Sequence, residues 1–300
     1  AQAARQFERQ YDVSPARADL VVRTAHATLR AMESLGSKDV CLYVGIPFCP
    51  TRCAYCSFVS QSVEKSMALV PEFLQALARE IAATAEAVRR AGLRVVSLYI
   101  GGGTPTTLSA RQLDALCTQL AAAFDLSALR EFTVEAGRPD TITADKLQVL
   151  RAHRVDRISV NPQTLSDRVL DTIGRRHTAQ DIYDALRLVR ETGGFAVNMD
   201  LIAGLPGDTP DGFRATLEQV LALAPENITV HTLSRKRGSN LMAQDAPIPD
   251  GAAVGEMLDF AGTVLPRAGY APYYLYRQKF MSGGFENVGW TRPGQENLYN

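Results

Sequence analysis

Three cysteines lie close together in the segment GIPFCPTRCAYCSF, and their type and spacing could support metal chemistry. Cys49, Cys53 and Cys56 are separated by three and then by two residues, directly after an apolar run. This spacing is too tight for a disulfide framework and is typical of thiolates that share a metal site in a reducing compartment. A cubane iron–sulfur cluster normally takes four thiolates. Three thiolates would therefore leave one iron of a [4Fe-4S] cluster open to a small molecule.

Two other interpretations of the three cysteines stay open at this point. The first is a structural zinc ion, although zinc sites of that kind are normally closed by four ligands. The four histidines of the chain are all too distant in the sequence to complete a local zinc motif. The second interpretation is that three buried cysteines meet by chance at the end of a strand. The other two cysteines, Cys41 and Cys117, stand in a strand-like run and at a core-like helical position.

A glycine run and four separated polar residues could complete a binding site. The run GGGTPT follows the second apolar run, and glycine lets a backbone approach a ligand closely and expose its amide groups. A plain glycine turn would have the same sequence. Four polar residues stand at or after the ends of later apolar runs, and they are Glu135, Gln163, Arg175 and Asp200. Each alone would more often be an ion pair or a helix cap, but their order along the chain favours one shared site.

The elements that would position these residues alternate along the chain. Short apolar runs, typical of strands buried on both faces, are each followed by a segment of helical periodicity. We expect strands at 40–47, 95–100, 131–136, 157–162, 195–206 and 227–233, and helices at 71–91, 109–124, 143–151, 166–173, 178–192, 210–223 and 251–268. This alternation predicts a parallel sheet, either open and doubly wound or closed into a whole or partial β/α barrel. Both architectures place chemistry at the carboxyl ends of the strands.

Three regions are expected along the chain. Residues 1–38 form a helical lead-in, and residues 39–233 form the strand–helix core. Residues 234–300, which include the alternating, aromatic-rich YAPYYLYRQKF, begin a different unit that leans on the sheet. The chain starts with Ala1 and stops at Asn300 within a polar, aromatic-rich stretch, so we expect it to be a fragment of a longer protein.

Composition and charge are those of an ordinary globular protein. Hydrophobic residues make up 46% of the chain and charged residues 21%, and Lys+Arg and Asp+Glu are 32 each. A formal net charge of zero provides no electrostatic basis for binding nucleic acid or an anionic membrane surface. No apolar run approaches the roughly 18 residues of a membrane span, and no signal-peptide pattern is present. We therefore expect a cytoplasmic protein without nucleic-acid or membrane partners.

The cysteine spacing after the first strand, with Tyr55 before the third cysteine, resembles that of the radical S-adenosyl-L-methionine (SAM) superfamily. In that superfamily the open iron binds the amino and carboxylate groups of SAM. Reductive cleavage of SAM then gives methionine and a 5′-deoxyadenosyl radical, which abstracts a hydrogen atom from the substrate. The glycine run resembles the loop that binds the SAM amino group, which implies that Gly102, Gly103 and Thr104 contact the methionine moiety.

Residues from about 40 to 300 resemble the oxygen-independent coproporphyrinogen III oxidase (HemN-type) family. The segments VGIPFCPTRCAYCSF, VEAGRPDTIT, VNPQTL and VHTLSRKRGS are most similar to its coproporphyrinogen dehydrogenase HemZ subgroup. The family fold implies a partial (β/α)6 TIM-like barrel with a C-terminal α+β extension. The chain departs from the oxidase at Gly45, where the oxidase has His, and at Phe58, where it has a fourth cysteine that is not a cluster ligand. The histidine difference bears on the substrate and on a second SAM molecule.

The resemblance also assigns roles to individual residues. Tyr43 stands six residues before Cys49, like the family's cluster-proximal tyrosine, and is implied to act in catalysis and in SAM binding together with Tyr55. Glu135 is expected near SAM. The SAM ribose and carboxylate would be held by three further side chains, Gln163, Arg175 and Asp200.

The implied activity is oxidative decarboxylation of two propionates of coproporphyrinogen III, giving protoporphyrinogen IX. It would need a reductant such as flavodoxin or ferredoxin and one or two SAM molecules. Two alternatives are a haem-binding or haem-delivery protein and a radical SAM methylase or cyclopropane-forming enzyme. Because tetrapyrrole propionates are anionic, Arg235, Lys236 and Arg237 are candidate substrate contacts, with a solvated basic loop as the alternative. We expect His231 and the tyrosines of YAPYYLYRQKF to pack in the core.

Overall fold

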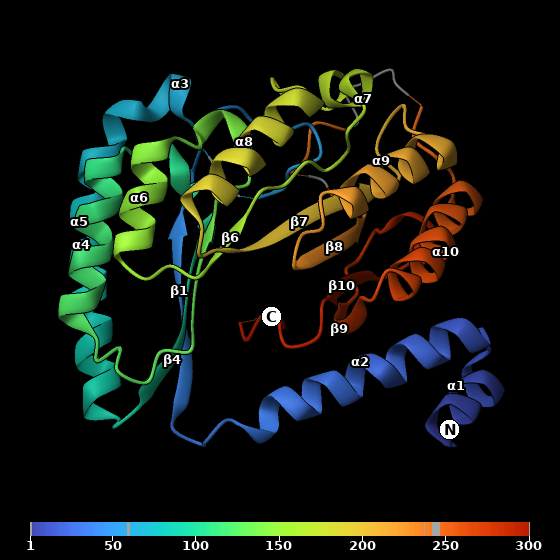
Figure 1. Cartoon of the computed structure of the whole chain (residues 1–300), viewed down its shortest axis with the longest axis horizontal. Helices are drawn as coiled ribbons and strands as arrows, with labels where there is room; N and C mark the ends of the chain where they lie inside the picture. The colour runs from blue at the N-terminus through green and yellow to red at the C-terminus, as the bar shows by residue number, and fades with distance from the viewer. Residues whose placement is uncertain (1, 59–60, 237, 242–246, 300) are drawn as a thin grey trace.

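A curled, eight-stranded sheet forms the centre of the molecule, seen in a computed structural model that describes residues 2–58, 61–236, 238–241 and 247–299 (Figure 1). The strand order is β1–β4–β5–β6–β7–β8–β10–β9. The first six strands are parallel and are β1 (Asp39–Ile46), β4 (Arg94–Gly102), β5 (Glu131–Glu135), β6 (Arg157–Ser159), β7 (Ala196–Ala203) and β8 (Asn227–Thr232). Because strands that follow one another in sequence are also neighbours in the sheet, the fold is a partial β/α barrel and not a doubly wound sheet.

Helices cover the outer face of the curled sheet (Figure 1). They are α4 (Val70–Arg90), α5 (Ala110–Ala123), α6 (Ala144–Ala152), α7 (Asp167–Thr172), α8 (Ala179–Thr192), α9 (Pro210–Ala222) and α10 (Gly251–Arg267). Helix α5 shows why the sequence folds this way. Its buried residues, Leu113, Leu116, Cys117 and Leu120, follow the three-and-four spacing of one helix face. A capping box between Ser109 and Gln112 satisfies backbone donors at its first turn. The predicted strand–helix alternation is confirmed.

The amino-terminal region consists of two helices, α1 (Gln2–Tyr11) and α2 (Pro15–Glu33), where the sequence predicted one helical segment. Proline is favoured in the first turn of a helix, and Pro15 begins α2. Helix α2 packs against a strand from the other end of the chain, and the Thr28 hydroxyl lies 3.5 Å from the Tyr273 carbonyl. Among the described residues, no helix has the length and apolar character needed to span a bilayer.

Residues after β8 continue the same sheet. Strand β9 (Ala271–Tyr276) was expected, but β10 (Asn287–Thr291) was not, and it lies between β8 and β9, antiparallel to both. All five residues of β10 are buried, because the strand is covered on both faces. The C-terminal α+β extension implied by the family resemblance is thus present, while the domain limits at residues 38 and 233 stay predictions.

The last described residues cross the amino-terminal ends of the strands. Arg157 of β6 donates to the carbonyl of Gln295 at 3.1 Å, and the Leu298 amide donates to Glu131 of β5 at 2.6 Å. The Tyr299 ring stacks on Tyr99 of β4, with ring centroids 4.5 Å apart. This terminal segment, residues 292–299, therefore connects the β10 side of the sheet to its β1–β4 side.

Candidate active site at the carboxyl ends of the strands

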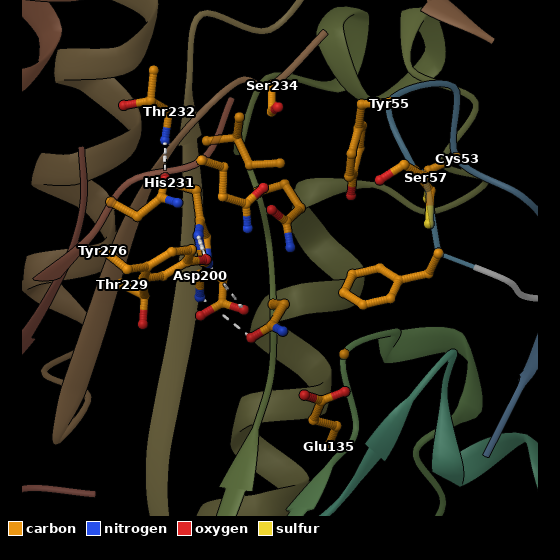
Figure 2. A pocket seen from close by; sticks show the side chains of 18 of the residues that line it. Cys53, Tyr55, Ser57, Glu135, Asp200, Thr229, His231, Thr232, Ser234 and Tyr276 are labelled. Atoms are coloured by element: carbon orange, nitrogen blue, oxygen red, sulfur yellow. Dashed lines mark hydrogen bonds and ion pairs between the residues drawn. The ribbon is translucent and has the colours of Figure 1, made fainter. Parts of the chain in front are cut away.

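A cavity of about 920 Å³ lies where a partial barrel places its chemistry, and its volume is near the upper end of the range usual for ligand pockets. Figure 2 shows Cys53 and Tyr55 on one side of it and Asp200 and His231 on the other. Every residue that the sequence predicted to hold a cluster or SAM lines this cavity, namely Tyr43, Cys49, Cys53, Tyr55, Cys56, Gly102, Gly103, Thr104, Glu135, Gln163, Arg175 and Asp200.

The cysteine loop is held in place by backbone hydrogen bonds from distant segments. Cys49 ends a short strand, β2 (Phe48–Cys49), which pairs with β3 (Gln61–Ser62) just before the short helix α3 (Val63–Ser66). The Ala54 amide donates to the Ile173 carbonyl at 2.9 Å, and the Ala54 carbonyl accepts from the Asn240 amide at 2.8 Å. These contacts fix the loop from both sides, so the cysteines are positioned by the fold.

The three thiols are not arranged around a single point. Within the described parts of the chain, no three His, Cys, Asp or Glu side chains converge closely enough to hold one metal ion. Tetrahedral zinc needs its sulfur ligands at about 2.3 Å from one centre. A cubane cluster is wider than an ion and takes each thiolate on a different iron.

The glycine run packs directly against the cysteine loop. A Cβ atom on Gly103 would lie 2.6 Å from the Phe48 carbonyl oxygen and 2.9 Å from Cys49 Sγ, so only glycine fits there. Three successive amides donate within the protein, from Gly102 to Glu135 at 3.2 Å, from Gly103 to Ile46 at 2.8 Å and from Thr104 to Phe48 at 2.7 Å. The expectation that this loop exposes its amides is therefore wrong. The loop can still receive an amino group, because an amino group needs carbonyl acceptors.

Glu135 is a half-buried carboxyl group with two donors. Its Oε1 accepts from the Tyr99 hydroxyl at 2.7 Å, and its Oε2 accepts from the Gly102 amide. Burial raises the pKa of Glu135 to about 7, and the nearby Asp200 charge adds to this, although the Tyr99 hydrogen bond opposes it. Near neutral pH this group can hold or release a proton. The carboxyl can therefore be protonated in the ligand-free protein and ionised when it pairs with a bound cationic ligand.

We expect Glu135→Gln to change how the stability of the ligand-free protein depends on pH. The folded-state pKa of about 7 lies above the ordinary value of 4.5. The stability contributed by the protonated group is therefore fully present below pH 4.5 and is lost as the pH rises through 7. As the pH rises from 5 to 8, the free energy of unfolding of the variant should increase relative to that of the parent by on the order of 2–3 kcal/mol.

Chemical denaturation at several pH values checks this expectation. Asp208→Asn provides a positive comparison, because Asp208 is a buried carboxyl that does not line the cavity. Burial raises the pKa of Asp208 as well, so this variant should change the pH dependence of stability in the same direction. A constant difference between parent and Glu135→Gln across the pH range would contradict the environment assigned to Glu135.

Asp200 lies in a polar cluster on the opposite wall. Burial alone would raise its pKa, but hydrogen bonds from His231, Asn198 and Thr229 outweigh burial and hold the pKa below its ordinary value. Asn198 donates to Asp200 Oδ1 at 2.8 Å, and His231 Nε2 lies 3.7 Å from Oδ2. Asp200 is therefore ionised at neutral pH and faces the cavity as a hydrogen-bond acceptor.

Gln163 and Arg175 present unused polar atoms to the same space. Gln163 has a φ of 65°, which is uncommon for a residue other than glycine and marks a strained backbone. Its backbone amide donates to the Asp200 carbonyl at 2.9 Å, while its buried Oε1 has no hydrogen-bond partner among the described residues. The Arg175 guanidinium donates to the carbonyls of Asn161 at 2.6 Å and Gly137 at 3.3 Å, but its buried Nε has no hydrogen-bond partner in the described parts of the chain. Buried polar groups without partners are costly, so these atoms favour a polar ligand.

The basic residues after β8 are divided by the structure. Lys236 lines the cavity, whereas Arg235 is exposed and does not, and Arg237 lies outside the described residues. Arg52, which the sequence analysis did not single out, also lines the cavity and donates to the Gly238 carbonyl at 2.7 Å. That bond places Arg52 and Lys236 at the same rim of the cavity.

Several further lining residues were not predicted. His231 and the tyrosines Tyr274 and Tyr276 were expected in the core but line the cavity, and the His231 ring lies 3.3 Å from the Tyr276 hydroxyl. Alternation along the strands is the sequence signal for this, since Val230 and Thr232 on either side of His231 are buried. Helix α2 also contributes a wall, through Val21, Thr24, Ala25 and Thr28. No local pattern could indicate that contact, because it joins segments far apart in the chain.

One sequence family and several individual proteins resemble this chain over most of its length. The sequence profile of the radical SAM superfamily matches residues 43–220. The oxygen-independent coproporphyrinogen-III oxidase-like protein HemZ of Bacillus subtilis is 43% identical over 265 residues, which is 87% of this chain and 53% of that protein. The haem chaperone HemW of Lactococcus lactis is 31% identical over 249 residues, covering 82% of this chain and 63% of that protein.

A solved structure has the same fold. The coproporphyrinogen III oxidase HemN of Escherichia coli, described as a radical SAM enzyme, superposes with a TM-score of 0.72 at 29% identity. The match covers 90% of this chain and 59% of that one. The chain thus spans less than two thirds of the length of each of these three relatives.

Proposed function

Because the chain belongs to the radical SAM superfamily and, within it, to the HemN-like family, we propose that it uses a [4Fe-4S] cluster and SAM to decarboxylate coproporphyrinogen III oxidatively to protoporphyrinogen IX. One observation carries the proposal. Three cysteines of one loop share a single cavity with polar side chains from four successive strand ends and with a glycine run packed against the first cysteine.

The residues present fit the cluster and SAM. Cys49, Cys53 and Cys56 would hold three irons, and the carbonyls of the glycine run would accept from an amino group at the fourth. Arg175, with its unused Nε, would pair with a carboxylate, and the ionised Asp200 would accept from ribose hydroxyls. When bound, the cluster supplies the electron that cleaves SAM reductively to a 5′-deoxyadenosyl radical.

Tyrosines form the wall near Glu135. Tyr43, half exposed to the cavity, stacks on Tyr99 with ring centroids 5.8 Å apart. Burial raises the pKa of Tyr43 to about 12, with further contributions from Glu135 and Tyr299, so its hydroxyl keeps its proton at neutral pH. Tyr43 would then act as a fixed hydrogen-bond donor beside the cluster and would exclude water from it.

The size and lining of the cavity support a large, flat, anionic substrate. Its volume of about 920 Å³ exceeds what a single small cofactor needs, and Tyr274 and Tyr276 offer aromatic surface. Arg52 and Lys236 on the rim carry the positive charge that propionates require. The family's coproporphyrinogen substrate has both features.

Anaerobic incubation of the reconstituted protein with coproporphyrinogen III, SAM and a reductant tests the proposal. Formation of protoporphyrin after oxidation, together with 5′-deoxyadenosine, would support it. Abortive SAM cleavage without any change in the porphyrinogen would overturn the substrate assignment. A methylated product would instead indicate the methylase alternative.

Haem binding or delivery is the second candidate. It rests on the 31% identity with the haem chaperone HemW of Lactococcus lactis, which is comparable to the 31% identity with the coproporphyrinogen III oxidase of Escherichia coli. Titration with haem separates the two. Stoichiometric haem binding and transfer to an apo-haem protein, without porphyrinogen turnover, would favour the second candidate.

Replacing both Arg52 and Lys236 by Gln should weaken the use of porphyrinogen. Each cation would lose a charge-assisted hydrogen bond to a propionate, and at an exposed rim we expect about a tenfold to hundredfold fall in kcat/KM for the pair. SAM cleavage without substrate should not change. Arg235→Gln is the matched control, since Arg235 is exposed and outside the cavity. Equal turnover by the double variant and the control would move the propionate site elsewhere.

A further inference from the structure

A buried arginine, Arg138, lies against the cysteine loop and has no role in the site described above. It follows β5 and is only 3% exposed. Its Nη1 donates to the Thr51 hydroxyl at 2.9 Å and lies 4.0 Å from Cys53 Sγ. Its Nε and Nη2 donate to the two carboxylate oxygens of Asp140 at 3.1 and 3.4 Å. The guanidinium is thus fixed by Asp140 and Thr51, and the Nη1 that donates to Thr51 also faces the Cys53 thiol.

The backbone around Arg138 holds this geometry. Its carbonyl accepts from the Thr141 amide at 3.1 Å and from the Thr141 hydroxyl at 2.8 Å. These bonds close a 3₁₀ turn over Pro139–Thr141, which returns Asp140 to the guanidinium. The contact with Cys53 is therefore built into a local turn and does not depend on a mobile side chain.

The charged side chains near Cys53 carry a net positive charge. Asp140 is the carboxylate paired with Arg138, and its side chain is 34% exposed, so water screens part of its charge. Arg138 itself faces the buried thiol. Arg175, the second buried guanidinium of the site, also lies near Cys53 and donates to the carbonyls of Asn161 and Gly137.

A cluster held by three thiolates gains a negative charge when it is reduced. A fixed positive group beside one of its thiolates stabilises the reduced state more than the oxidised state, because hydrogen bonds and net charge set cluster potentials. We infer that Arg138 is a positioning residue that raises the reduction potential of the cluster and orients Cys53 for it. This inference rests on the proposed cluster site.

Potentiometric titration of the reconstituted cluster, followed by electron paramagnetic resonance, tests the inference without using activity. Arg138→Gln removes the charge but keeps polar contact with Thr51, and it should shift the midpoint to a more negative potential. Arg138→Lys keeps the charge but loses the two-point contact with Asp140, so its midpoint should lie between those of the parent and the Gln variant. Iron content should stay at the parent level in both.

Asp140→Asn separates an electrostatic effect from a structural one. Removing the carboxylate leaves the Arg138 charge less compensated, so the midpoint should shift to a more positive potential. Mere disturbance of the turn would shift both the Arg138 and the Asp140 variants in one direction. Arg176→Gln serves as the control, because Arg176 is exposed and paired with Glu64, and its midpoint should match the parent's.

The outcomes distinguish this inference from the function on which it rests. An unchanged midpoint in Arg138→Gln, or shifts of the same sign in the Arg138 and Asp140 variants, would overturn the inference while the cluster site stands. Failure of the parent protein to take up iron would instead remove the proposed cluster. Loss of iron in Arg138→Gln, which should keep iron at the parent level, would likewise overturn the inference.

Discussion

Replacing Cys53 by alanine is expected to abolish cluster binding. Cys53 is the most buried of the three cysteines, at 9% exposure, and the loop around it is fixed by backbone bonds that the substitution does not touch. Iron content after anaerobic reconstitution should fall from about four atoms per chain to near zero, with loss of the broad visible absorption. Single alanine variants of Cys49 and Cys56 should behave alike.

Cys41→Ser is the matched control for that experiment. Cys41 is an exposed cysteine on β1 and does not line the cavity, so its substitution should leave iron content unchanged. Full iron and normal absorption in Cys53→Ala would contradict the ligand assignment. Binding of stoichiometric zinc by the parent protein, with no iron–sulfur absorption after reconstitution, would contradict the cluster itself.

Asp200→Ala should weaken SAM binding while leaving the cluster intact. Asp200 is ionised, and Asn198 and His231 hold it on the wall opposite the cysteine loop (Figure 2). Loss of one charge-assisted hydrogen bond costs about 1.5–3 kcal/mol, which corresponds to roughly a tenfold to hundredfold fall in affinity. Equilibrium binding of SAM to the reconstituted protein measures it.

Two comparisons make the Asp200 result specific. Asp208→Asn alters a second buried carboxyl outside the cavity and should keep the affinity of the parent protein. Arg175→Gln should weaken SAM binding to a similar degree, because it removes the proposed partner of the SAM carboxylate. Unchanged SAM affinity in both the Asp200 and the Arg175 variants would remove this assignment.

Much of the site could be predicted because a parallel sheet imposes where its strand ends lie. Glu135 ends β5, Asp200 lies on β7 and the glycine run begins at the end of β4, yet they share one cavity because the carboxyl ends of parallel strands meet at one edge. The strands themselves were recognisable because both of their faces are covered, which requires nearly continuous apolar runs. Local periodicity and topology are therefore enough to gather residues that are distant in sequence.

The unpredicted parts depend on contacts that no local pattern records. Strand β10 enters the sheet between β8 and β9, which both precede it in the chain, so its place in the sheet does not follow the sequence order of the six parallel strands. His231 was wrongly expected to pack in the core, because the residues next to it along the strand are largely apolar. In a partial barrel the inner face near a strand end borders the cavity, so an inward side chain there meets ligand space.

The terminal segment has a consequence for how the protein folds as it is synthesised. Tyr299 stacks on Tyr43 with ring centroids 5.8 Å apart, so almost the last described residue completes a contact with the first strand. Emerging strands can pair with their predecessors in turn, since neighbours in sequence are neighbours in the sheet. The terminal segment, residues 292–299, can cross the amino-terminal ends of the strands only after residue 299 has left the ribosome. A nascent chain that lacks residues 292–299 would therefore hold a paired but unbridged sheet, whose amino-terminal strand ends are less protected from proteases and hydrogen exchange than once that contact is complete.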